Sequence, residues 1–192
     1  MPLTRLQAVN RMLTPLGESV ILVEVEGAGD YANCSEVLDQ TTQDVLLKDW
    51  QFNTEIRTMT PDANGKVTVG PEVLKIDPVF KSNDYVQRGA YLYDRKNKTD
   101  VFTDSVDVKV TLLFRFEDCP FHVQRKIVAD AAARYQRGYV GSRAADEFMQ
   151  QDRAEAGADT EAAEADVDNY NVLEDDPDMA YLYRRTYRPG VI

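Results

Sequence analysis

The spacing of apolar residues changes twice along this 192-residue chain, and this change limits the folds open to it more than any other feature. In the first 50 residues, apolar side chains recur every three or four positions, which is the period of an amphipathic helix. From Gln51 to about Phe116 they alternate with polar residues, as in a β-strand. Helical spacing returns after Pro120. We therefore expect an α+β protein in which a β region interrupts a set of helices.

The first two predicted helices lie before the β region. Thr4 and Gln7 occupy the positions of a capping box, and Gly17 follows the last apolar residue, so a helix is predicted between them. A loop is expected at residues 27–30. A second helix then runs from about Cys34 to about Asp49.

Two more helices are predicted after the β region. Pro120 suits the first position of a helix that ends at Gly138 or Gly141. A last helix covers residues 142–169 and has apolar anchors only near its start, so we expect its second half to be solvated or to dock elsewhere. The third helix carries small residues that would let another helix approach closely, whether within the core or in a neighbouring subunit: Ala129, Ala131, Ala132 and Ala133.

Within the β region, Asn64-Gly65 is the strongest hairpin signal, with residues 66–69 beginning the return strand. The stretch at 85–102 interleaves aromatic and basic residues, which is typical either of a strand hairpin or of a surface that stacks nucleobases. We favour the hairpin. Residues 106–116 become continuously apolar, as in a strand buried first on one face and then on both. The region resembles a small antiparallel sandwich or barrel.

Aromatic residues of this region are predicted to form its structural core: Trp50, Phe52, Tyr91, Tyr93 and Phe114. A polar turn follows the aromatic stretch, and we expect it to face a neighbouring protein: Arg95, Lys96, Asn97 and Lys98.

The net charge of −11 and pI near 4.6 argue against a general nucleic-acid binder, because phosphate binding depends on lysine and arginine. No apolar run reaches the roughly 20 residues that span a bilayer, and the N-terminus has helical rather than signal-peptide spacing, so we expect a soluble protein made in the cell. Cys34 and Cys119 lie far apart in no metal-binding pattern. Free buried thiols, and no cofactor or metal, are predicted.

No catalytic motif accompanies His122, the sole histidine, and neither a P-loop nor a dinucleotide-binding fingerprint is present. We therefore expect no enzyme and no catalytic residues. One enzymatic alternative stays open, a glycan hydrolase acting on the bacterial envelope, because it needs only two suitably placed carboxylates among the 33 present.

The last 21 residues concentrate tyrosine and arginine in a segment too short to fold alone. Because these residues dominate binding hot spots, we expect this tail to insert into a neighbouring subunit or another partner protein, the alternative being a disordered terminus. The predicted contact residues are Tyr181, Tyr183, Arg184, Arg185, Tyr187 and Arg188.

Four stretches, in this order and spacing, resemble the tail tubular protein A family of T-seven-like short-tailed phages: LQAVNRMLTPLGE, DWQFNTE, VQRGAYLYDRKNKTDVF and CPFHVQRKIVADAAARYQRGYVGS. The resemblance implies a helical bundle of residues 1–50 and 117–170, an inserted β domain at 51–116 and a docking tail at 171–192. Ser19 departs from the family, which often has proline there.

The resemblance also implies a structural virion protein. Its members form a twelve-membered ring between the portal protein and the nozzle protein, tail tubular protein B, with the tail fibre as a further candidate partner. They are virion components assembled in the host cytoplasm, and DNA passes through the ring without sequence-specific binding. A negative lumen wall would keep DNA from adhering, so the resemblance suggests a role for the net negative charge.

Overall fold

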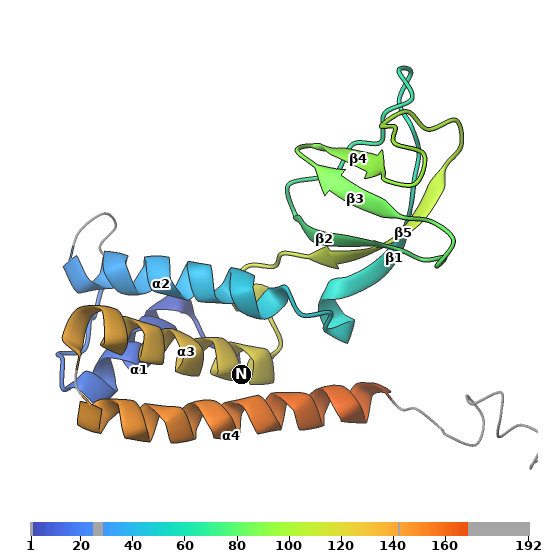
Figure 1. The fold of residues 1–192 in the computed structure, drawn as a ribbon. Coiled ribbons are helices and arrows are strands. Elements are labelled where there is room, and N and C mark those ends of the chain that lie inside the picture. Colours follow the sequence, from blue (N-terminus) through green and yellow to red (C-terminus); the bar gives the residue numbers. More distant parts are fainter. Residues whose placement is uncertain (1, 25–28, 142, 169–192) are drawn as a thin grey trace, which may run out of the picture.

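The computed structural model describes residues 2–24, 29–141 and 143–168, and it confirms the α+β class. Figure 1 shows the helices side by side at one end of the molecule and the strands at the other. The helices are α1 (Arg5–Leu13), α2 (Gly29–Leu46), α3 (Phe121–Tyr135) and α4 (Arg143–Asp168). The strands are β1 (Thr54–Met59), β2 (Val73–Pro78), β3 (Tyr85–Arg88), β4 (Tyr91–Asp94) and β5 (Val106–Leu112). Short helical turns are η1 (Thr14–Leu16), η2 (Gln51–Asn53), η3 (Phe116–Asp118) and the π-helical η4 (Gln136–Val140).

Helix α3 is the centre of the helical part, where it contacts α1, α2 and α4. The side chains between these helices are fully or almost fully buried, and they include Val9, Met12, Leu38, Leu46, Ile127 and Ala131. The alanines of α3 belong largely to this core, since Ala131, Ala132 and Ala133 are all buried. Their small size therefore serves packing within the chain.

The predicted start of α1 is confirmed. The hydroxyl of Thr4 accepts a hydrogen bond from the backbone N–H of Gln7, and the side chain of Gln7 accepts one from the backbone N–H of Thr4. This capping box satisfies two N–H groups that the helix cannot pair internally. The helix then continues through η1 and stops at Gly17, whose φ of 75° is left-handed.

Two helix predictions need correction. Gly29 and Asp30 lie in the first turn of α2, where a loop was predicted. The second half of α4 does not stand in solvent, because Ala156 and Thr160 are buried against α3. The Thr160 hydroxyl donates to the carbonyl of Ala156 (2.7 Å) and also lies 3.2 Å from that of His122 in α3. Small and polar residues thus make the contact between the second half of α4 and α3. The sequence does not predict this contact, because large apolar residues are scarce there.

The strands form a three-stranded antiparallel sheet in the order β1-β5-β2 and a two-stranded sheet of β3 and β4. Strand β5 is the centre of the larger sheet, and its side chains alternate as predicted, with Val106, Val108, Val110 and Leu112 buried. An apolar cluster joins the two sheets and also holds Val67, Val69 and Leu92.

The predicted hairpin at Asn64-Gly65 is wrong, although the turn exists. Asp62 Oδ1 accepts backbone hydrogen bonds from Asn64 and Lys66, and Gly65 has a φ of 76°. The chain after the turn does not return along β1, however, because β1 pairs with β5. Residues 66–69 instead place two buried valines in the cluster between the sheets. Burial of these valines outweighs the local preference for a hairpin.

The aromatic stretch forms the predicted hairpin of β3 and β4, but its turn lies at Gly89 and Ala90. Tyr91 is not a core residue as predicted, since it is 41% exposed, whereas Leu92 beside it is fully buried. Alternation correctly placed Tyr91 and Tyr93 on one face, but that face is the outer one. Tyr93 is half-buried beneath the Arg88 guanidinium, which lies 3.6 Å from its ring centre.

The other three predicted core aromatics lie where the helices meet the sheets. Trp50 is buried and donates from its indole N–H to the carbonyl of Val45 (2.8 Å). Phe52 and Phe114 are half-buried, and their ring centres are 6.1 Å apart.

Candidate interaction surfaces

Three kinds of group that can carry chemistry are a histidine beside a carboxylate, cysteine thiols and metal-binding clusters. Nε2 of His122 lies 3.8 Å from Oε1 of Glu164. Burial raises the pKa of Cys34 to about 11 and of Cys119 to about 12, so both stay as unreactive thiols at neutral pH. No three His, Cys, Asp or Glu side chains in the described ranges are grouped to hold a metal ion. In the same ranges, no helix is both long and apolar enough to cross a membrane.

A polar cluster around Asp49 joins the helices to the larger sheet. Its carboxylate accepts hydrogen bonds from Thr111 Oγ1 (2.8 Å), Lys75 Nζ (3.0 Å) and Lys109 Nζ (3.4 Å). Burial opposes ionisation of Asp49, but the hydrogen bonds from Lys75 and Thr111 and the charge of Lys109 outweigh it and lower the pKa. This charged contact fixes the end of α2 to strands β2 and β5.

Asn53 makes a second connection between the two parts. Its buried side-chain amide donates to the carbonyl of Leu46 at the end of α2 (2.8 Å) and to that of Leu112 at the end of β5 (3.1 Å). The backbone N–H of Gln51 donates to Glu164 of α4 (3.0 Å). Asp49 and Asn53 both come from the DWQFNTE stretch, but their roles depend on residues 26 to 62 positions away, which no local pattern reveals.

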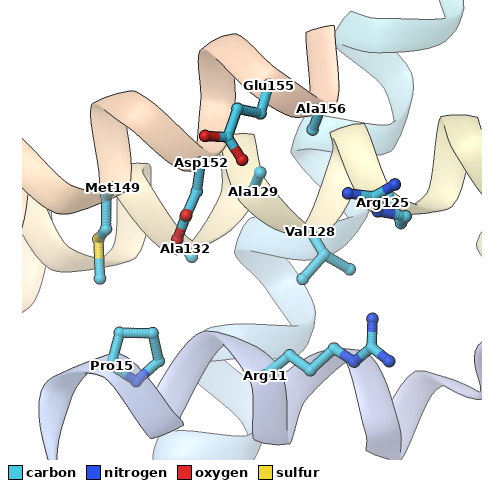
Figure 2. Close-up of a pocket in the computed structure, with 10 residues that line it drawn as sticks. All are labelled: Arg11, Pro15, Arg125, Val128, Ala129, Ala132, Met149, Asp152, Glu155 and Ala156. Carbon is cyan, nitrogen blue, oxygen red and sulfur yellow. The ribbon is translucent and has the colours of Figure 1, made fainter. Parts of the chain in front are cut away.

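A groove of about 220 Å³ lies over α3, between α1 and α4. Figure 2 shows Arg11 of α1 and Pro15 of η1 on one side and residues of α4 on the other. Val128, Ala129 and Ala132 of α3 form an apolar floor, and the rim is charged. Asp152 and Glu155 of α4 face Arg11 across the gap without forming an ion pair with it. An apolar floor with a charged rim is the usual composition of a protein-binding surface.

The predicted polar turn at residues 95–98 is exposed and rigidly built. Asp94, which is buried, accepts from the backbone and side-chain N–H groups of Asn97 (2.9 and 2.7 Å). Arg95 pairs with Asp84 (3.0 Å), and Lys96 donates to the carbonyl of Ser82 (3.0 Å). Lys98 has a positive φ of 55° and makes no ion pair with the described residues. Two of the three cations thus hold the turn, and one faces solvent.

The remaining predicted site residues belong to the tail. Tyr181, Tyr183, Arg184, Arg185, Tyr187 and Arg188 lie outside the described residues.

Comparison with known proteins identifies a family for this chain, which the geometry alone does not. The family model for tail tubular proteins matches residues 6–170, which includes both the helices and the sheets. Tail tubular protein A of Klebsiella phage KP34 is 29% identical over 118 residues, which are 61% of this chain and 63% of that relative. The matched region thus covers less than two thirds of that relative's length. Because the family model extends over most of the sequence, this chain belongs to the tail tubular protein family.

Proposed function

We propose that this protein is a ring-forming adaptor that joins the portal vertex of the capsid to the tail nozzle. The observation that carries the proposal is the family match over residues 6–170, which extends through both structural parts and the joint between them. In this arrangement the helices form one bundle, residues 51–116 form an inserted sandwich-like domain, and the tail at 171–192 docks on a partner. Family membership identifies a structural component of the phage tail, and the adaptor role is the specific form that we infer.

The connections at the joint support a subunit that transmits force between the capsid and the tail. Asp49, Asn53 and the Gln51 backbone link both ends of the β region to three different helices or strands. A subunit that transmits force between capsid and tail needs its two parts held at a fixed angle. Buried side-chain amides and charge-assisted hydrogen bonds give such rigidity better than apolar contacts alone, because they are directional.

The charge of the chain fits a channel for DNA. Twelve copies at −11 each would carry about −132, and a mostly negative lumen wall would repel the phosphate backbone during passage. DNA would then cross the ring without sequence-specific binding. The polar turn at 95–98 projects from the sheets, and we assign it to contacts with the nozzle protein.

The test is the mass of the full chain alone and after mixing with its cognate portal protein, measured by native mass spectrometry. We expect a complex with several copies of the chain, up to twelve, when portal is present. Repeating the mixture at several salt concentrations separates specific assembly from weak charge attraction. Absence of any association across that range would refute the adaptor role.

A further inference from the structure

A second groove, of about 790 Å³, runs along α2, and no residue of α3 or α4 lines it. Its wall on α2 consists of residues spaced three or four apart, which therefore share one face of the helix: Tyr31, Ala32, Ser35, Glu36, Asp39, Gln40 and Gln43. Thr4, Arg5, Glu24 and Glu117 complete the lining. Twelve residues of helix rise about 18 Å, so the groove is as long as five or six residues of extended chain.

The groove has more carboxylates than cations. Glu24, Glu36, Asp39 and Glu117 line it, and Arg5 is the sole cation among its lining residues. Arg5 is already engaged, since it pairs with Asp39 (2.5 Å) and lies 3.5 Å from Glu117. The hydrogen bond to Asp39 is the main reason that the pKa of Arg5 is raised. Three negative charges therefore remain uncompensated in the groove.

The one aromatic residue that lines the groove is almost fully covered by the core. Tyr31 is buried to 6% exposure beside the groove, and burial is the main cause of its raised pKa. A long groove with surplus carboxylates suits a peptide rich in arginine, because guanidinium groups pair with carboxylates.

This chain contains a peptide of that composition. Residues 181–188 read YLYRRTYR, with three arginines, three tyrosines and no carboxylate, and no carboxylate follows before Ile192. Their charge of about +3 is equal and opposite to the net charge of the side chains that line the groove. Eight extended residues reach about 26 Å, so most of the segment fits along the face of α2.

The segment is within reach of the groove of its own chain. Helix α4 ends at Asp168, one turn beyond Glu164, which lies 3.8 Å from His122. His122 follows Glu117 of the groove by five residues, so the end of α4 and this end of the groove lie at the same end of the helical part. The 12 residues from 169 to 180 span up to about 40 Å. That length is ample to pass round the start of α3.

We propose that in the unassembled subunit this groove binds residues 181–188 of the same chain, with the arginines paired to Glu24, Glu36 and Glu117. The tail is then held on its own subunit until it meets its partner in the virion, and any partner must compete with the groove for it. The proposal concerns the free subunit, so it stands or falls independently of the adaptor function.

Trypsin cleavage after Arg184 and Arg185 in the full chain tests the contact, with products followed by mass spectrometry and no portal present. We compare wild type with the double variant Glu24→Gln, Glu36→Gln. The matched control is Glu147→Gln, Glu161→Gln, which removes two exposed carboxylates from α4 and creates no new cleavage site. Loss of two ion pairs should speed cleavage of the tail about fivefold in the groove variant, because cleavage follows the population of the released segment. Equal rates in the groove variant and wild type would overturn the proposal.

Photo-crosslinking separates binding within one chain from binding between chains. Tyr183→p-benzoylphenylalanine in full-length protein should crosslink to residues 29–46. In an equimolar mixture of isotopically heavy and light chains, products should be purely heavy or purely light. Mixed heavy–light products, or crosslinks that avoid α2 altogether, would contradict the assignment.

Discussion

Asn53 shows how one side chain can connect two structural parts. Its amide donates to two buried carbonyls, at the end of α2 and at the end of β5. Removing the amide leaves those carbonyls in a place that water does not easily reach, and such groups cost about 1–3 kcal/mol. We therefore expect Asn53→Ala to lower the free energy of unfolding by about 2–3 kcal/mol in urea denaturation. Gln150→Ala, at an exposed position on α4, should change it by less than about 0.5 kcal/mol, and a similar loss in both variants would contradict the bridging role.

Asp49 makes the stability of the joint depend on pH. Its pKa is lower in the folded protein than in the unfolded chain, so its contribution to stability is present above the unfolded value of about 3.9 and is lost as pH falls through the folded value. Asp49→Asn should therefore be less stable than wild type at pH 7, by about 1 kcal/mol because the pair is partly screened by solvent. Thermal melts at pH 7 and pH 3 should show this gap closing at the lower pH. A gap that stays constant would mean that the charge of Asp49 is not what holds the joint.

Single residues differ in how far the sequence predicts them. The capping box joins Thr4 to Gln7, three residues apart, so the local sequence pattern is sufficient to predict it. Tyr91 was assigned wrongly, because alternation shows which residues share a face of a strand and not which face is covered. The part of the chain that covers β4 includes Val67 and Val69, which follow a turn that local preference assigns to a hairpin. No sequence pattern predicts the cluster around Asp49, because the three side chains that donate to its carboxylate are 26 to 62 residues away.

At the scale of elements, helix α4 illustrates how small residues make a tight contact. Ala156 is buried against α3 in the half of α4 that lacks large apolar side chains. A larger side chain there must displace α3 or adopt a strained rotamer, which typically costs about 1–3 kcal/mol. We expect Ala156→Leu to destabilise the protein by that amount in urea denaturation. Ala158→Leu, two residues along on an exposed position, should be nearly neutral, and equal effects of the two would mean that α4 is not held against α3 at this point.

Element types and most boundaries follow from the spacing of apolar residues, whereas strand pairing does not. The predicted and observed helices agree to within a few residues at most ends. The partner of β1 is β5, about 50 residues later, and the order β1-β5-β2 brings the two ends of the β region together. That closure places Leu46 and Leu112 within reach of Asn53. Pairing between distant strands depends on which surfaces are buried together, and sequence spacing carries no such information.

At the scale of the whole molecule, the chain leaves the helical part once at Trp50 and returns once at η3, so the helices before and after the sheets form a single core. The order of elements predicted this connectivity in outline. The two grooves could not be predicted, because each is lined by residues from three or more separate segments. Both lie on the helical part, one over α3 between α1 and α4 and the other along α2, so they offer two different binding faces to the rest of the tail.

Because the groove of Figure 2 has an apolar floor and a charged rim, we expect it to contact a partner in the assembled tail, and the rim gives a direct test. Asp152→Lys with Glu155→Lys turns the α4 side of the rim positive, so that it repels any cation that docks there and matches the charge of Arg11 opposite. Charge reversal at a desolvated interface typically costs several kcal/mol, so we expect the portal-dependent complex to weaken at least about 100-fold by sedimentation. Glu161→Lys with Asp166→Lys makes the same change in net charge on exposed positions of the same helix. If both pairs weaken assembly equally, total charge governs it and the groove does not; if only the first pair does, the partner enters between α1 and α4.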